Sequence, residues 1–290
     1  MPDAPASEPA ASEPAAFELA QAHWPEVERG PRQLLVVPVG SLEQHGPHLP
    51  LDTDTRIAVA VARRACAGRT GVALAPPLPI GASGEHAAFP GTLSIGSEAL
   101  ASCLIELGRH ASLHWPALLL VNGHGGNVTA VEAAVGRLRY EGRACLAWHV
   151  ALPESDAHAG RSETSIMLAL APSAVRLDAA ERGDVRPLER ILPLLREQGV
   201  RAVSANGVLG DPAGASATEG ERLLGHLADG LTAAMDGFLA GSAGSAGRAG
   251  SAGRAGSAGR AGSAGRDGSA GRPGRPGDGG RPGSADRRRA

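Results

Sequence analysis

The strongest constraint on the fold is a regular alternation of short, apolar segments with longer amphipathic ones. The run from Gln33 to Val39 opens the series, and its apolar residues between turn signals are typical of a buried strand. The next segment, Asp54 to Cys66, repeats its apolar residues at helical spacing. Further strands are predicted at 72–75, 117–121 and 144–150, and further helices at 97–114, 128–140, 162–170 and 219–239. Such alternation predicts an α/β domain with a mainly parallel sheet that is covered on both faces.

We expect one domain between residues 17 and 240, flanked by disordered tails. Residues 1–16 contain no large apolar side chain after the initiating methionine, and residues 241–290 repeat Gly, Ser, Ala and Arg. Neither composition can bury a core. The C-terminal tail has ten Arg and three Asp, so its charge is +7. Because the whole chain has a net charge of −2, residues 1–240 have a charge of −9. The domain is therefore acidic and the tail basic.

The composition excludes several classes of protein. No apolar run reaches the roughly 18 to 20 residues that cross a bilayer, so we expect no membrane span. The N-terminus has no basic region followed by an apolar core, so we expect no secretory signal. An acidic domain with few aromatic residues argues against nucleic-acid binding, and the absence of lysine excludes Schiff-base chemistry. Three widely separated cysteines fit a reducing cytoplasm.

Polar, metal-ligating residue types follow three of the predicted strands. Because the carboxyl ends of parallel strands meet at one edge of a sheet, these residues should lie together. Imidazole and carboxylate groups in such number suit Zn²⁺, Fe²⁺ or Mn²⁺, and a bridging carboxylate suits a pair of ions about 3.5–4 Å apart. Singly, Asp54 could be a helix cap and His124 a turn residue, but the set predicts metal chemistry. The candidates are Glu43, His45 and Asp54 after the first strand, His124 after the 117–121 strand, and His158 and Glu163 after the 144–150 strand.

Four motifs resemble the creatininase (creatinine amidohydrolase) family over about residues 20 to 238. They are Gly-Ser-Leu-Glu-Gln-His-Gly-Pro-His-Leu-Pro-Leu-Asp-Thr-Asp-Thr, Phe-Pro-Gly-Thr-Leu-Ser, Asn-Gly-His-Gly-Gly-Asn and His-Ala-Gly-Arg-Ser-Glu-Thr-Ser. The resemblance implies a three-layer α/β/α fold, two divalent metal ions per chain and hydrolysis of amide-type C–N bonds. Glu43, His45, Asp54 and His124 match the ligand positions of the family, with Asp54 as the bridging carboxylate.

The sequence departs from creatininase itself at one ligand. Creatininase has a glutamate two residues after the motif histidine, and here that position is Gly126. We expect Glu163 to supply the missing carboxylate, and the departure argues against creatinine as the substrate.

A narrower resemblance is to the mycofactocin-system branch of the family. It rests on Gly81-Ala82-Ser83-Gly84-Glu85-His86, on residues 138–143 and on residues 207–212. The branch consists of peptidases that release a cross-linked, Val–Tyr-derived C-terminal dipeptide from a ribosomally made precursor peptide. The resemblance therefore implies a modified precursor peptide as substrate, and the family as a whole implies a homo-oligomer.

The same residues suggest a mechanism. Bound Fe²⁺, Zn²⁺ or Mn²⁺ would lower the pKa of water and polarise an amide carbonyl. His158 and Glu163 are the candidate catalytic residues: His158 would protonate the leaving amine, and Glu163 would face the ions. The backbone of the turn at Gly125 and Gly126 could bind an oxyanion. Glu85 and His86 are expected to contact the substrate.

Two other functions stay open at this stage. The same metal site could serve a hydrolase acting on a cyclic amide or a formamide, since only the pocket would differ. A non-catalytic member that binds a peptide or a partner enzyme is the other alternative, although the full ligand set speaks against it. A serine hydrolase is disfavoured because the chain has no Gly-x-Ser-x-Gly motif.

Overall fold

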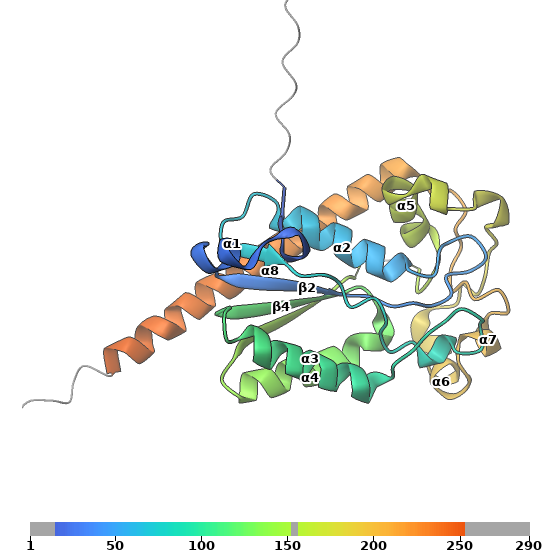
Figure 1. Ribbon diagram of the computed structural model, residues 1–290. Coiled ribbons are helices and arrows are strands. Elements are labelled where there is room, and N and C mark those ends of the chain that lie inside the picture. The colour runs from blue at the N-terminus through green and yellow to red at the C-terminus, as the bar shows by residue number, and fades with distance from the viewer. Residues whose placement is uncertain (1–14, 152–155, 253–290) are drawn as a thin grey trace, which may run out of the picture. The chain divides into compact units, whose positions relative to one another are not determined.

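The computed structural model describes residues 15–151 and 156–252, and within them it contains one five-stranded sheet (Figure 1). The strand order is β1-β3-β2-β4-β5, and every neighbouring pair is parallel. The register aligns Val36 with Leu119 and Leu119 with Leu146. The strands are β1 (Phe17–Glu18), β2 (Leu34–Val39), β3 (Val72–Leu74), β4 (Ala117–Asn122) and β5 (Ala144–His149). The parallel sheet predicted from the alternation is confirmed.

Helices fill the connections between the strands. The α-helices are α1 (Trp24–Arg29), α2 (Thr53–Cys66), α3 (Ser97–Ala111), α4 (Val128–Tyr140), α5 (Arg161–Leu170), α6 (Leu188–Gln198), α7 (Val200–Val203) and α8 (Ala217–Ala252). The 3₁₀ turns are η1 (Leu19–Gln21), η2 (Gly84–His86), η3 (Gly125–Asn127), η4 (Pro172–Ala174) and η5 (Leu177–Ala179). No helix of the described residues is long and apolar enough to cross a bilayer.

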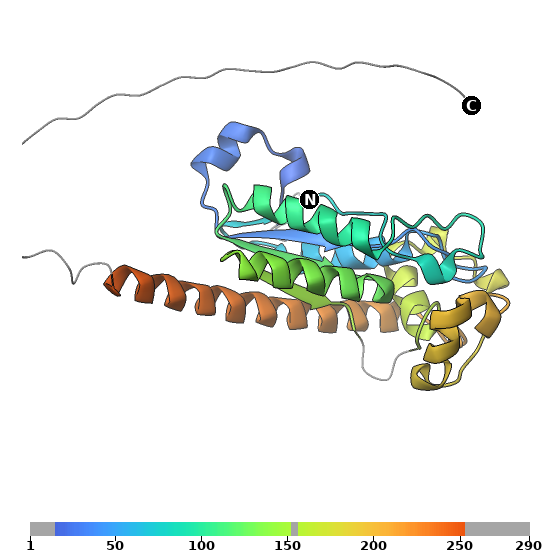
Figure 2. The ribbon, with the colours of Figure 1, turned by 90° about the horizontal axis from the view of Figure 1, so that it is seen from below.

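Two hydrophobic cores lie on opposite faces of the sheet. Successive side chains of a strand point to opposite faces, so Leu34 and Val36 of β2 join one core while Leu35 and Val37 join the other. Residues of α2, α5 and α8 pack in the first core, and residues of α3 and α4 pack in the second. Figure 1 shows these layers above and below the strands, and Figure 2 shows the molecule from the side of α3 and α4. The three-layer α/β/α arrangement is therefore confirmed.

The structure differs from the sequence expectations at several ends. α3 stops at Ala111, where the Ser112 hydroxyl bonds back to the Gly108 carbonyl, 2.7 Å away. α6 and α7 were not predicted, because Pro193 lies inside α6 and Gly199 separates the two helices, and both residue types disfavour a helix interior. α8 continues past the expected boundary at 240 to Ala252, since extending an existing helix needs no new nucleus. The rest of the expected tails, 1–14 and 253–290, lies outside the described residues.

The first turn of α8 packs closely on α5, and this contact can be tested with two glycines of the same helix. A Cβ at Gly220 would overlap the Ser165 carbonyl, whereas a Cβ at Gly225 would meet no atom within 4 Å. We predict that Gly220→Ala lowers the free energy of unfolding by about 1–3 kcal/mol, because backbone must move. Gly225→Ala should raise it by about 0.5–1 kcal/mol through helix propensity. Denaturant titration of both variants measures the difference, and equal effects would contradict the packing.

Candidate metal centre

The predicted metal-ligating residues come together at the carboxyl edge of the sheet. The loop after β2 carries Glu43 and His45, and Asp54 lies in the first turn of α2. His124 follows β4, and Glu163 lies in the first turn of α5. Parallel strands end at one edge, so loops that are far apart in sequence deliver their side chains to one place.

Asp54 is the centre of this cluster. Its Oδ1 lies 3.1 Å from His45 Nε2, and its Oδ2 lies 3.1 Å from His124 Nδ1. Ser41 donates a hydrogen bond of 2.7 Å to the same Oδ2. The two carboxylate oxygens therefore face two different histidines, which is the arrangement that a bridging carboxylate needs.

Glu43 shows that the cluster fits a cation. Its side chain is fully buried, yet neither carboxylate oxygen accepts a hydrogen bond within the described part of the chain. The nearest ring nitrogens are His124 Nε2 at 3.0 Å and His86 Nε2 at 3.4 Å. A buried carboxylate without a donor is costly unless a positive charge offsets it, so the donor set fits a bound metal ion.

Three groups of possible ligands overlap in this cluster. Within each group, one ligand atom per residue lies within 4.8 Å of the others. The groups are Glu43, His45 and Asp54; His45, His158 and Glu163; and Glu43, His86 and His158. The Nδ1–H of His45 donates to the Glu43 carbonyl at 3.1 Å, which leaves Nε2 facing the carboxylates, as is usual for a metal-binding histidine.

The charges of the cluster shift several pKa values. Burial alone would lower the pKa of His45, but Asp54 outweighs it and raises the pKa to about 10. Burial likewise opposes a charged His124, yet the charge of Glu43 and a bond with Asp54 hold its pKa well above the usual value. Burial raises the pKa of Glu163 to about 7, and the charge of Asp54 adds to this effect. Without a metal ion, protons on the histidines and on Glu163 offset the negative charge of the cluster. Metal binding would release these protons.

His158 has a different environment. Burial, and then the charges of His45 and His86, hold the pKa of His158 well below its usual value, so the ring is neutral. Its Nε2 lies 2.8 Å from the main-chain carbonyl oxygen of Gln44. A carbonyl oxygen can only accept a hydrogen bond, so Nε2 carries the ring proton. Its Nδ1 lies 3.8 Å from Glu43 Oε1 and keeps a free lone pair toward the cluster.

The Gln44 side chain fixes a second histidine. Its Oε1 accepts the Gly46 N–H at 2.8 Å, which settles the orientation of the amide. The amide nitrogen then donates to the Gly207 carbonyl at 3.0 Å and to His86 Nδ1 at 2.9 Å. The other ring nitrogen of His86, Nε2, lies on the side of Glu43, 3.4 Å from Oε1. The sequence analysis did not single out Gln44, although its place between two ligand candidates is a usable signal.

Glu85 occupies the space beside Gly126. A Cβ at Gly126 would overlap Glu85 Oε1 and would lie 2.5 Å from His124 Nε2. Glu85 Oε1 itself lies 3.4 Å from that nitrogen. Burial would raise the pKa of Glu85, but its bond with His124 lowers it, so the side chain is a carboxylate. Glycine at 126 thus makes room for a carboxylate from another loop.

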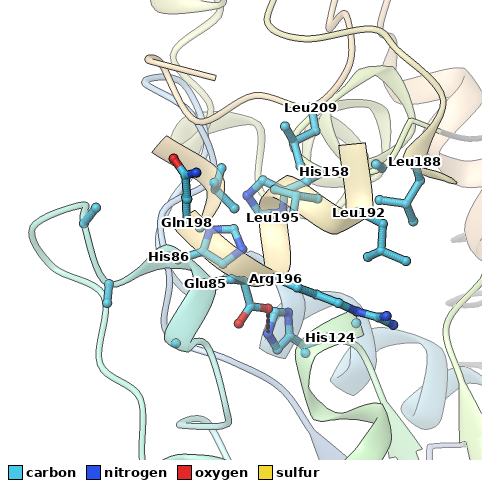
Figure 3. Close-up of a pocket in the computed structure, with 18 of the residues that line it drawn as sticks. Glu85, His86, His124, His158, Leu188, Leu192, Leu195, Arg196, Gln198 and Leu209 are labelled. Atoms are coloured by element: carbon cyan, nitrogen blue, oxygen red, sulfur yellow. Dashed lines mark ion pairs between the residues drawn. The ribbon is translucent and has the colours of Figure 1, made fainter. Parts of the chain in front are cut away.

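A cavity of about 840 Å³ opens onto the cluster (Figure 3). The residues predicted to touch substrate line it together with part of the cluster, namely Glu85, His86, Gly125, Gly126, Asp54, His124, His158 and Glu163. Its other wall comes from α6, which the sequence analysis missed. Glu43 and His45 lie beneath its floor, fully buried.

His48 plays a supporting part at the edge of the cluster. It is buried, and its Nε2 lies 2.9 Å from Thr164 Oγ1. Burial, with the nearby charge of His45, lowers the pKa of His48 to about 4. The contact ties the loop after β2 to α5, which carries Glu163.

Comparisons with known proteins give consistent matches. The family model described as creatinine amidohydrolase matches residues 20–235. The chain is 52% identical over 203 residues to the mycofactocin precursor peptide peptidase of Mycolicibacterium smegmatis, covering 68% of this chain and 82% of that one. It is 31% identical over 183 residues to the creatinine amidohydrolase of Pseudomonas putida, covering 50% of this chain and 67% of that one. The solved structure named "Creatininase Mn" aligns with a TM-score of 0.62 at 27% identity, over 77% of this chain and 99% of that one.

The packing at Gly126 generates a prediction with a matched control. We predict that Gly126→Ala lowers the divalent metal bound per chain at least several-fold, because the methyl group would overlap Glu85, the Ala82 carbonyl and the proposed ligand His124. Gly125→Ala should retain the wild-type metal content, since a Cβ there would meet no atom within 4 Å. Elemental analysis of both purified variants checks this, and equal metal content in the two would contradict the geometry.

Proposed function

The chain belongs to the creatininase family, and from that premise we propose that it is a metal-dependent peptidase acting on a C–N bond. Its substrate would be the modified mycofactocin precursor peptide, from which it would release the Val–Tyr-derived C-terminal dipeptide. The 52% identity to a mycofactocin precursor peptide peptidase supports this substrate over creatinine. The presence of Gly126 and Glu85 where creatininase has its glutamate is consistent with a different pocket.

The observation that carries the chemistry is Asp54 between two histidines beside an unbonded, buried Glu43. We propose that Glu43, Asp54 and His124 hold one divalent ion and that His45, Asp54 and Glu163 hold the second. Zn²⁺, Fe²⁺ and Mn²⁺ all suit this set of nitrogen and oxygen ligands. When bound, such ions polarise the scissile carbonyl and make water a stronger nucleophile.

His158 would move the proton. Its neutral ring accepts a proton at Nδ1 as water attacks the carbonyl carbon, and it then gives that proton to the leaving amine. The Gln44 carbonyl holds the Nε2–H throughout, so the ring keeps its orientation. The carbonyl also stabilises the imidazolium that forms between the two transfers.

The remaining proposed contacts are with the substrate. Gly125 and Gly126 are the first residues of the 3₁₀ turn before α4, and both line the cavity. Their backbone N–H groups could bind the developing oxyanion. Glu85 and His86 line the cavity next to His124, where they would orient the amide that is cleaved.

Cellular location and assembly are also proposals. The three cysteines, Cys66, Cys103 and Cys145, are free, which fits a reducing cytoplasm. We infer a homo-oligomer from family membership.

Replacing His158 and His124 separates proton transfer from metal binding. We predict that His158→Ala keeps the metal and loses about 10²–10⁴-fold in kcat, the usual scale for general acid–base catalysis. His124→Ala should lose metal and activity together. Metal analysis alongside kinetics measures both, and loss of metal in His158→Ala would make His158 a ligand instead.

The substrate proposal is tested by chelation and by substrate comparison. Removal of metal should abolish cleavage of the modified precursor peptide, and one of Fe²⁺, Zn²⁺ or Mn²⁺ should restore it. Mass spectrometry should find the C-terminal dipeptide as product, while creatinine and a formamide should be hydrolysed at least about a hundredfold less efficiently. Efficient hydrolysis of the small amides with no cleavage of the peptide would favour the alternative, a small-molecule amidohydrolase.

A further inference from the structure

One face of α6 presents a row of leucines to the cavity. Leu188, Leu192 and Leu195 follow each other at intervals of four and three residues, which places them on the same side of a helix. All three line the cavity that contains His124 and Glu163 (Figure 3). Leu188 is 43% exposed, so the row leaves apolar surface open next to a polar floor.

Leu209 fixes this row beside His158. The backbones of His158 and Leu209 pair as an isolated antiparallel bridge, with Leu209 N donating to His158 O at 2.9 Å. The Leu209 side chain packs in one buried cluster with Leu195 and Ile191 of α6. Leu209 therefore pairs with His158 through its backbone and packs against α6 through its side chain, which sets the leucine row on the His158 side of the cavity.

The position of His158 defines which part of a substrate meets the leucines. A group that protonates the leaving amine must lie on the amine side of the scissile bond. The leucine row flanks that group, so it faces the fragment that departs as an amine. Residues on the acyl side would lie toward the opposite end of the cavity.

Arg196 extends the apolar wall. It follows Leu195 on α6 and lines the same cavity, and it forms no ion pair with any residue that the structure describes. Its methylene stem adds apolar surface, and its planar, weakly hydrated guanidinium can cover an aromatic ring. Glu85 and Glu197 line the cavity as well, so its charge does not favour an anionic fragment.

We infer, given the proposed peptidase function, that Leu188, Leu192, Leu195 and Arg196 form the subsite for the fragment on the amine side. This wall, called the α6 wall below, selects a large apolar or aromatic side chain and not a carboxylate. The geometry thus provides a substrate-specificity site on a helix that contributes no metal ligand.

Equilibrium binding of product-like fragments tests this inference without requiring turnover. Calorimetry with the metal-loaded protein should show Val-Tyr-amide binding at least about tenfold tighter than Ser-Ser-amide, the scale of discrimination in apolar pockets. Leu188→Ala and Leu192→Ala should each weaken Val-Tyr-amide about five- to tenfold and leave Ser-Ser-amide unchanged. Leu177→Ala is the control, because Leu177 is also exposed, at 52%, but lies outside the cavity.

Two results would overturn the α6 wall. The first is a lack of selectivity: the wild type binds the two amides equally, or the leucine variants lose the same affinity for both. The other is free Val-Tyr binding more than tenfold tighter than its amide, with the difference lost in Arg196→Gln, because the subsite would then recognise a carboxylate. The protein could prefer Val-Tyr-amide, lose that preference in the leucine variants, and yet cleave no precursor peptide. That result would support the α6 wall and refute the proposed peptidase function, so failure of one proposal is distinguishable from failure of the other.

Discussion

The cluster of Glu43, Asp54 and their neighbouring histidines depends on negative charge that is buried at the carboxyl edge of the sheet. Glu43 is fully buried without a hydrogen-bond donor, and Asp54 lies beside it with an oxygen toward each of two histidines. Such a concentration of carboxylates is unfavourable unless cations or protons offset it. The loops that carry these residues follow strands that are fixed between two hydrophobic cores. The proposed metal ions follow from this concentration of negative charge, because they would offset it.

Much of this arrangement could be predicted from the sequence, because parallel strands end at one edge. The apolar runs located β2, β4 and β5, and the polar residues after them were expected to meet, as Glu43, Asp54 and His124 do. The tautomer of His158 could not be predicted, since it depends on the carbonyl of Gln44, distant in sequence. α6 was not predicted because Pro193 disfavours a helix interior, whereas in the structure its apolar residues keep helical spacing and pack with Leu209.

At Gly126 this chain differs from creatininase within a shared motif. Creatininase has a glutamate at this point of the motif, whereas here the space belongs to Glu85, which comes from η2 and faces His124. A carboxylate on a cavity-lining loop can contact a substrate as well as a histidine. In the proposed site, Glu163 of α5 holds metal, and Glu85 of η2 contacts the substrate. The α6 wall then adds apolar selectivity on the other side of the same cavity.

We propose above that Asp54 would be a ligand of both divalent ions. Anomalous diffraction from crystals of the metal-loaded protein, collected at the absorption edge of the bound element, tests it most directly. The account predicts two peaks about 3.5–4 Å apart, one on each side of the Asp54 carboxylate, with Glu43 and His124 at the first and His45 and Glu163 at the second. A single peak, or a pair that Asp54 does not touch, would contradict it.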